Sequence, residues 1–171
     1  MKRLNLGCGL DIKKGYVNTD FLKLPNVDVV HDFNKFPYPF KNGEFDLIYT
    51  SHVLEHLENL PQVMKELKRI SKDGGRIIIR VPHFSCGVSY RDPTHERLFS
   101  YHTFDYFTAE CFYGLPTFKI ARRKLNFTRQ SFTFLNVFLN PIININPTLY
   151  ERFFCWILPC AEVLIELETT R

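Results

Sequence analysis

Residues 3–9, RLNLGCG, combine a short strand with a glycine turn. Leu4 and Leu6 are the apolar positions of this strand, which stops at the Gly-x-Gly of Gly7 and Gly9. Because glycine lacks a side chain, a ligand can approach the backbone of such a turn closely. The stretch therefore predicts the first strand of a sheet and a ligand-binding turn at its carboxyl end.

Further short runs of apolar or β-branched residues, bounded by Gly, Pro or Asp, predict the other strands. They cover residues 16–20, 27–32, 45–51, 75–82, 118–127 and 162–170. Residues 60–75, LPQVMKELKRISKDGG, predict a helix, since Val63, Leu67 and Ile70 fall on one face and Gly74–Gly75 supply a stop. Strand, helix and strand at this spacing form a βαβ unit, so we expect a largely parallel sheet layered by helices.

Acidic residues close two of the predicted strands. Asp20 closes the second strand, where a carboxylate can accept hydrogen bonds from both hydroxyls of a ribose. Asp32 closes the third strand and precedes Phe33, whose ring is suited to lie against a flat base. Ligands of open parallel sheets bind beyond the carboxyl ends of the strands, so these residues together predict an adenosine-shaped cleft.

Dinucleotide and triphosphate sites are disfavoured. The dinucleotide fingerprint needs a third glycine where Ile12 stands, and its acidic residue is expected about 20 residues beyond the glycines, whereas Asp20 comes much sooner. The chain also lacks a G-x-x-x-x-G-K-[ST] motif.

Four ordered motifs carry a resemblance to a known family: LNLGCG (4–9), GYVNTD (15–20), VDVVHDFNKFPYPFKNGEFDLIYTSHVLEHL (27–57) and GGRIIIRVPHFS (74–85). Over residues 3–107 the chain resembles the class I S-adenosylmethionine-dependent methyltransferases, especially their small stand-alone microbial members. The resemblance implies an α/β, Rossmann-like three-layer fold with a mostly parallel seven-stranded sheet and an antiparallel C-terminal strand. It implies one domain over residues 1–171, with S-adenosylmethionine as cofactor and S-adenosylhomocysteine as product.

The resemblance also implies a set of cofactor-binding residues. The set is Leu6, Gly7, Cys8 and Gly9 near the aminoacid portion, Asp20 and Phe21 at the ribose, Asp32 and Phe33 at the adenine, and Ser51 and His52 beside the sulfonium. The link from Gly9 to Asp20 is short, so we expect the first crossover helix to be abbreviated or replaced by a loop. We expect the substrate cap to come from residues 84–116, from residues 131–161, or from a second subunit in a homodimer.

The stretch SHVLEHL, residues 51–57, contains the H-x-x-E-H pattern of one class of zinc peptidases. That site needs both histidines on one stable helix. The strand before Ser51 and the helix restart at Pro61 leave room for little more than a turn, so the metal-dependent hydrolase is only a third hypothesis.

A second metal interpretation rests on resemblance. Some class I methyltransferases acting on hydroxyl groups carry E-x-x-E-H and bind a divalent ion with a later histidine. Here His52 replaces the first Glu, Glu55 and His56 match, and His95 is the later histidine. The His52 substitution weakens the match, so a divalent metal is not favoured and no metal ligand is predicted. The alternative is that Glu55 and His56 cap the following helix.

The catalytic residues we predict are His95, His56 and Asp92. His95 and Asp92 lie in a loop, DPTHERLF, expected to fold over the open side of the cofactor, and an imidazole near its ordinary pKa suits proton abstraction from a hydroxyl. His83 is a candidate to face the methyl donor, and His31 is expected to pack or to face solvent. The alternative for His95 is a packed loop histidine.

The acceptor is partly constrained. The Asn/Asp-Pro-Pro-aromatic turn of many amine-directed methyltransferases is missing after the fourth strand, so a small-molecule or saccharide-type acceptor that is methylated on oxygen or carbon is favoured over a nucleobase amine. A net charge of +4 is too weak to favour nucleic acid. A basic string, Lys119 to Arg129, suits phosphates or a solvated strand face. The alternative function is a non-catalytic, nucleoside-binding regulatory module.

The setting expected is reducing and cytoplasmic. Five cysteines form no C-x-x-C pair, and neither a signal peptide nor a transmembrane segment is evident. The aromatic segment 131–161 is expected to be a lid, a dimer interface or a lipid-facing surface.

Overall fold

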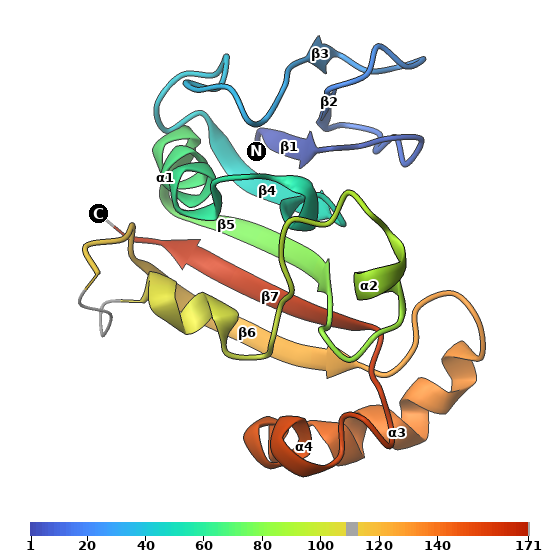
Figure 1. The fold of residues 1–171 in the computed structure, drawn as a ribbon. Coiled ribbons are helices and arrows are strands. Elements are labelled where there is room, and N and C mark those ends of the chain that lie inside the picture. Colours follow the sequence, from blue (N-terminus) through green and yellow to red (C-terminus); the bar gives the residue numbers. More distant parts are fainter. Residues whose placement is uncertain (109–112, 171) are drawn as a thin grey trace.

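The computed structural model describes residues 1–108 and 113–170, and a seven-stranded sheet of order β3-β2-β1-β4-β5-β7-β6 forms its centre (Figure 1). The strands are β1 (Arg3–Leu6), β2 (Val17–Asp20), β3 (Val29–Val30), β4 (Phe45–Ser51), β5 (Ser71–Pro82), β6 (Phe118–Asn126) and β7 (Glu162–Thr169). Strands β1 to β5 pair in parallel, and β7 runs antiparallel between β5 and β6. The predicted Rossmann-like α/β fold, with a mostly parallel seven-stranded sheet and an antiparallel last strand, is confirmed.

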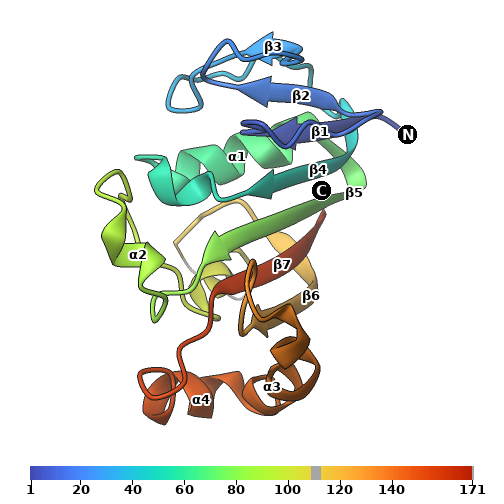
Figure 2. The same cartoon turned by 90° about the vertical axis from the view of Figure 1, so that its right-hand side faces the viewer.

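The helical elements are short, and two of them lie beyond the β6 edge of the sheet. In chain order they are η1 (Leu54–His56), α1 (Leu60–Ile70), α2 (Val88–Arg91), η2 (Thr103–Phe107), η3 (Thr133–Leu135), α3 (Asn136–Ile143) and α4 (Pro147–Phe153). In both views α3 and α4 lie at the end opposite β3 (Figures 1 and 2). Residues 7–16, all of them described, form turns without a helix, as predicted for the first crossover.

Helix α1 covers the core face of the sheet. Val63, Met64 and Leu67 on its inner side are each 0% exposed, and Asn59 caps its first turn by accepting a hydrogen bond from the amide of Gln62 at 3.1 Å. The prediction that the helix runs to residue 75 is wrong. Ser71 already has extended backbone angles and pairs with Phe45, so β5 begins where the helix ends.

The alternation of apolar and charged residues along β5 places the hydrophobic core on one face of the sheet. Ile77, Ile79 and Val81 are each 0% exposed, whereas the alternate positions Arg76 and Arg80 point to the other face, where they meet carboxylates of β7. The edge strand β3 is shorter than predicted, so Asp32 lies two residues past its end. Within the part of the chain that the structure describes, no helix is both long and apolar enough to cross a membrane.

Candidate cofactor and methyl-transfer site

The turn after β1 is joined directly to the end of β2. The amide of Cys8 donates to the carbonyl of Thr19 at 2.8 Å, and the amide of Gly9 donates to Oδ2 of Asp20 at 2.7 Å. The other oxygen of Asp20 accepts from the amide of Leu22 at 3.0 Å. The predicted glycine turn and the predicted ribose carboxylate are therefore neighbours at one rim of the sheet.

Glycine is required in this turn for two different reasons. Gly7 has φ +69°, and a Cβ there would come within 2.2 Å of Cγ2 of Val53. Gly9 has φ +49°, and a Cβ there would meet nothing within 4 Å, so its surroundings are open to a ligand. The exposed side chains of Leu10 (85%) and Phe21 (64%) flank this opening with apolar surface.

The remaining predicted cofactor residues differ in what they expose. The side chains of Leu6 and Cys8 are buried, so they offer only backbone to a ligand, and burial together with the charge of Asp20 raises the pKa of the Cys8 thiol. The ring of Phe33 packs edge-on against Tyr38 in the core, whereas Asp32 is exposed. Contact of Asp32 and Phe33 with a base stays a prediction.

His52 lies at the carboxyl end of β4 between two buried glutamates. Its φ is +57°, an unusual value for a residue with a side chain, and its amide donates to the carbonyl of Arg80 at 2.8 Å. Nδ1 lies 3.2 Å from Oε1 of Glu55, and Nε2 lies 3.5 Å from Oε2 of Glu162. Both glutamate side chains are 1% exposed.

Electrostatics tie these groups together. Burial would raise the pKa of Glu162, but contacts with His52 and Arg80 outweigh it and lower that pKa to about 2. For His52, burial opposes protonation, but the two carboxylates outweigh it and raise its pKa. Asn126 also donates to Glu162 at 2.7 Å. An imidazolium is thereby favoured beside the end of β4.

The sequence analysis did not identify Glu162 and Arg80 as part of this site. The available signal was the alternation of charged with apolar residues along both β5 and β7. That alternation places Arg80 and Glu162 on the same face of neighbouring antiparallel strands, although it does not reveal the partner strand.

The predicted catalytic residues are brought together by the loop after α2. The rings of His56 and His95 lie 4.7 Å apart between centroids. Nδ1 of His95 contacts the carbonyl of Ser89 at 3.1 Å, and Nδ1 of His56 contacts Oγ1 of Thr94 at 2.9 Å. That threonine hydroxyl donates to Asp92 at 2.7 Å, and the hydrogen bonds from Thr94 lower the pKa of Asp92.

The H-x-x-E-H stretch does not form the helix that a zinc peptidase needs. Its Glu55 and His56 lie in η1, a single 3₁₀ turn, while His52 precedes that turn in a left-handed conformation. The alternative prediction that Glu55 and His56 cap the next helix is also wrong, because Asn59 caps α1. Among the described residues, neither oxygen of Glu55 has a hydrogen-bond partner.

His83 does not face the rim. It is 0% exposed, with Nδ1 2.8 Å from Oγ of Ser85 and Nε2 3.0 Å from Oε1 of Glu151 in α4. The prediction that it faces a methyl donor is therefore not supported, and its role is to attach α4 to the end of β5. His31 packs against Tyr38, as expected.

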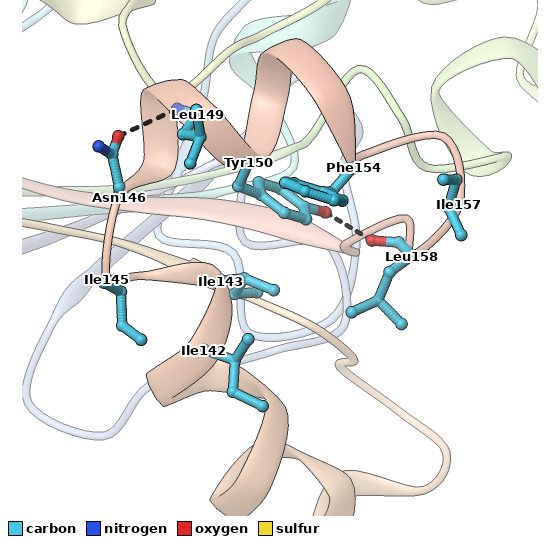
Figure 3. A pocket seen from close by; sticks show the side chains of 9 residues that line it. All are labelled: Ile142, Ile143, Ile145, Asn146, Leu149, Tyr150, Phe154, Ile157 and Leu158. Atoms are coloured by element: carbon cyan, nitrogen blue, oxygen red, sulfur yellow. Dashed lines mark hydrogen bonds between the residues drawn. The ribbon is translucent and has the colours of Figure 1, made fainter.

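An apolar hollow of about 320 Å³ lies between α3 and α4 (Figure 3). Its lining consists of Ile142, Ile143, Ile145, Asn146, Leu149, Tyr150, Phe154, Ile157 and Leu158. Tyr150 closes one side by donating its hydroxyl to the carbonyl of Leu158 at 2.7 Å. The hollow belongs to segment 131–161, which the sequence analysis predicted to be a lid, a dimer interface or a lipid-facing surface.

Comparison with known proteins agrees with this geometry. Residues 3–79 match the family model described as a methyltransferase domain. A S-adenosylmethionine-dependent methyltransferase from Archaeoglobus fulgidus superposes with a TM-score of 0.68 at 17% identity, over 98% of this chain and 86% of that protein. Residues 3–79 are thus similar in sequence to a methyltransferase domain, and the whole chain has the fold of S-adenosylmethionine-dependent methyltransferases.

Curated relatives match this chain only over a short stretch. A sterol 4-C-methyltransferase of Caenorhabditis elegans is 42% identical over 41 residues, covering 24% of this chain and 12% of the relative. A tocopherol O-methyltransferase of Arabidopsis thaliana is 44% identical over 41 residues, with the same coverage of 24% and 12%. The stretch that matches thus covers only 12% of the length of each of these two relatives.

Proposed function

We propose that this protein transfers the methyl group of S-adenosylmethionine to an oxygen or carbon atom of a small-molecule or saccharide-type acceptor. The observation that carries the proposal is the 2.7 Å hydrogen bond from Gly9 to Asp20, which assembles the glycine turn and the ribose carboxylate into one rim. The site residues fit the cofactor because the space around Gly9 is open and Leu10 and Phe21 offer apolar surface beside it.

Residues of the rim hold the cofactor and orient the acceptor. When bound, S-adenosylmethionine supplies an activated methyl group on a sulfonium. Gly7 to Gly9 and Asp20 would hold it, with Ser51 and His52 beside the sulfur. Transfer would leave S-adenosylhomocysteine as the product, and the proton that the acceptor loses would pass to a residue of the site. Placing the two reactants in line supplies much of the rate.

Acceptor activation is assigned to His95, His56 and Asp92. Asp92 orients Thr94, which holds Nδ1 of His56, and the carbonyl of Ser89 holds Nδ1 of His95. Nε2 of each imidazole is thereby left to act on the acceptor, with Nε2 of His95 3.9 Å from Oδ2 of Asp92. The described part of segment 84–116 supplies the cap, whereas α3 and α4 of segment 131–161 lie beyond the β6 edge, away from β1 and β2. Residues 109–112 lie outside the described residues. The names of the sterol C- and tocopherol O-methyltransferases support carbon or oxygen acceptors.

The chain is proposed to work in a reducing, cytoplasmic setting. Cys8, Cys86, Cys155 and Cys160 are all unpaired thiols, and Cys111 lies outside the described residues.

Calorimetric titration with S-adenosylmethionine tests the cofactor assignment. We expect wild type to bind and Asp20→Ala to lose at least tenfold in affinity, because a buried carboxylate at the ribose position is removed. Asp11→Ala is the matched control, since Asp11 is an exposed acid in the same turn that pairs with Lys13. Absence of binding by wild type, or unchanged binding by Asp20→Ala, would refute the assignment.

A labelled-methyl assay tests transfer itself. Incubation of the protein with labelled cofactor and cell extract should label a small-molecule fraction. A protein that binds the cofactor yet labels nothing is instead a non-catalytic nucleoside-binding module.

A further inference from the structure

A buried carboxylate and two imidazoles converge where the loop after α2 meets η1. Glu55, His56 and His95 each offer one ligand atom, and these atoms all lie within 4.8 Å of one another. The amide of Glu96 donates to the carbonyl of Glu55 at 2.8 Å, which fixes the loop against the turn. The three side chains are therefore held together by the backbone of both segments.

Glu55 is buried and shares its imidazole neighbour, His52, with a second glutamate. Its side chain is 1% exposed, yet neither carboxylate oxygen has a hydrogen-bond partner among the described residues. His52 approaches Oε1 at 3.2 Å but also faces Glu162, so one imidazole stands between two buried carboxylates. Oε2 of Glu55, which is not the oxygen that His52 approaches, has no hydrogen-bond partner among the described residues, and buried polar groups are usually hydrogen-bonded or coordinate metals.

Hydrogen bonds fix the tautomers of both imidazoles in the form that a metal needs. Nδ1–H of His95 donates to the carbonyl of Ser89, so the lone pair of the neutral ring is on Nε2. The hydroxyl of Thr94 donates to Asp92, so it can only accept from Nδ1–H of His56, whose lone pair is likewise on Nε2. Such contacts from outer groups are what orient metal-binding histidines.

We propose that Glu55, His56 and His95 bind one divalent transition-metal ion. Two imidazole nitrogens and one carboxylate oxygen suit Zn²⁺, Mn²⁺ or Fe²⁺ better than Mg²⁺. Metal–ligand distances of about 2.0–2.2 Å bring ligand atoms closer than 4.8 Å, so binding draws the three side chains together. The ion neutralises Glu55 and leaves coordination positions for a further ligand.

The role of the ion, unlike its binding, rests on the proposed function. An acceptor hydroxyl on the ion would lose its proton more readily, and the ion would hold its oxygen in place for attack on the methyl group. In that case Nε2 of His56 and Nε2 of His95 would coordinate the ion and could not accept a proton, so the proton of the acceptor hydroxyl would pass to solvent.

Titration of the metal-free protein with ZnCl₂, MnCl₂ and MgCl₂ tests the site. We expect one Zn²⁺ per chain, weaker Mn²⁺ binding and at least hundredfold weaker Mg²⁺ binding. Glu55→Gln and His95→Asn should each lower the Zn²⁺ affinity at least tenfold. His102→Asn is the matched control, since that imidazole contacts Asp105 and Thr148 instead.

The outcomes separate this proposal from the methyl-transfer proposal. No Zn²⁺ binding by wild type, equal binding by His95→Asn, or a preference for Mg²⁺ overturns the metal site. Circular dichroism confirms that the variants fold, and Glu55→Gln preserves the shape of the buried side chain. Because Zn²⁺ and S-adenosylmethionine are titrated separately, Zn²⁺ binding without cofactor binding leaves the metal site standing and refutes the proposed function.

A second observation, independent of the site, concerns the C-terminal segment. Among the described residues, eleven of the twenty-one exposed large hydrophobic side chains lie between Phe132 and Ile157. This set, called the apolar surface below, consists of Phe132, Phe134, Val137, Phe138, Ile142, Ile145, Leu149, Phe153, Phe154, Trp156 and Ile157. Helix α3, NVFLNPII, is apolar on nearly all sides, yet only Ile143 is buried. A helix that is hydrophobic all round is normally buried in protein or lipid.

Charge indicates what covers this surface. Residues 114–161 contain six Lys or Arg and one acidic residue, Glu151, so they carry +5 while the whole chain carries +4. Glu151 is bonded to His83 and to the amide of Tyr101, so it does not face outward. A second copy of the chain would oppose the same positive charge, whereas an anionic surface is complementary to it.

We infer that the apolar surface docks onto a membrane with anionic headgroups. Exposed Phe and Trp beside Arg and Lys are the composition of interfacial membrane-binding elements. The aromatic rings and isoleucines enter the boundary of the acyl chains. Basic residues of β6, which lies next to α3 (Figure 2), face the headgroups; Arg123 is not among them, because it pairs with Asp105. The hollow between α3 and α4 then opens toward the lipid (Figure 3).

Trp156, the single tryptophan of the chain and 65% exposed, is a built-in probe of docking. Mixed phosphatidylglycerol–phosphatidylcholine vesicles should shift its emission to shorter wavelength and sediment the protein, and phosphatidylcholine vesicles should bind at least tenfold more weakly. Ile145→Ser/Ile157→Ser, at positions that are each 81% exposed, should weaken docking at least tenfold. Val30→Ser, on the opposite edge, is the control.

Three results would overturn the inference. They are no binding to the anionic vesicles, equal binding to neutral vesicles, or a dimer in light scattering whose Trp156 emission is already shifted without lipid. The last result assigns the apolar surface to a second copy of the chain.

Discussion

At the scale of single residues, Gly7 combines a backbone and a packing requirement. Its φ is +69° and a Cβ would lie 2.2 Å from Val53, whereas Gly43 has a similar φ of +62° with nothing within 4 Å. We expect Gly43→Ala to lower the free energy of unfolding by about 1–2 kcal/mol and Gly7→Ala by about 2–5 kcal/mol. Urea unfolding measures the free energy of unfolding of both variants. Equal losses of stability would show that the side chain of Val53 moves aside to make room for the new Cβ.

The buried carboxylate of Glu162 makes stability depend on pH. Its folded pKa is about 2, below the ordinary 4.5, so its contribution is present above about pH 4.5 and is lost as pH falls toward 2. His52 has a raised pKa, so its contribution is present below 6.5 and is lost as pH rises through the folded value. The network therefore stabilises the fold most in mildly acidic solution.

Urea unfolding of wild type and Glu162→Gln at several pH values measures this contribution. The difference in unfolding free energy should reach up to about 3 kcal/mol near pH 5–6 and shrink toward pH 2. Glu166→Gln, which loses only a pair with the more exposed Arg76, should cost less than about 1 kcal/mol. A difference for Glu162→Gln that is constant with pH would contradict the network.

Local signals were sufficient to predict part of the site. Gly7, Gly9 and Asp20 stand at strand ends that the sequence marks directly, and the structure joins them. Glu162 was missed because its partners, His52 and Arg80, lie more than 80 residues away in the chain. Contacts at that separation depend on strand order, which residue patterns alone do not specify.

At the scale of elements, α1 depends on its cap. Asn59 accepts from the amide of Gln62, and no acidic residue lies in the first turn to replace it. Asn59→Ala should lower stability by about 1 kcal/mol, and Asn59→Asp, which caps equally well, should be close to neutral. Thermal unfolding distinguishes the two variants; equal losses would mean that Asn59 acts through its amide nitrogen instead.

The type of each main-sheet element was predictable, but its bounds were not. The helix was predicted five residues too long because Gly74–Gly75 was interpreted as its stop, while pairing of Ser71 with Phe45 ends it earlier. The third strand was predicted over residues 27–32 but covers only Val29–Val30, because only these two residues pair with β2. In both cases tertiary pairing outweighed the local pattern.

At the scale of the molecule, the segment after β6 could not be predicted beyond its composition. Most of its apolar residues are exposed in the described chain, and only a few, such as Ile143 and Tyr150, join the core, so neither core periodicity nor a strand pattern applied. Asn136 and Asn140 instead attach α3 to the backbone of Thr128 and Phe127. Nothing in the sequence around these two asparagines indicates that their side chains accept hydrogen bonds from the backbone after β6.

The sheet is expected to be unevenly stable across its width. Strand β5 pairs with both β4 and β7 and lies under α1, whereas the two-residue edge strand β3 pairs only with β2. Amide hydrogen exchange should therefore be slowest in β5 and fastest around β3, because local opening is cheapest where few bonds and little apolar contact resist it.

Cofactor binding should slow amide exchange in the β1–β2 half of the sheet and leave exchange in the β6–β7 half unchanged. S-adenosylmethionine held by Gly7 to Gly9 and Asp20 would slow exchange at the amides of Cys8, Gly9 and Leu22, whose hydrogen bonds close the rim. Strands β6 and β7, at the other side of the sheet, should change little. Hydrogen exchange with and without cofactor, read by NMR, measures the pattern. Equal protection of β6 and β1 would mean that the cofactor stabilises the whole fold rather than the rim, and would remove the structural reason for placing it there.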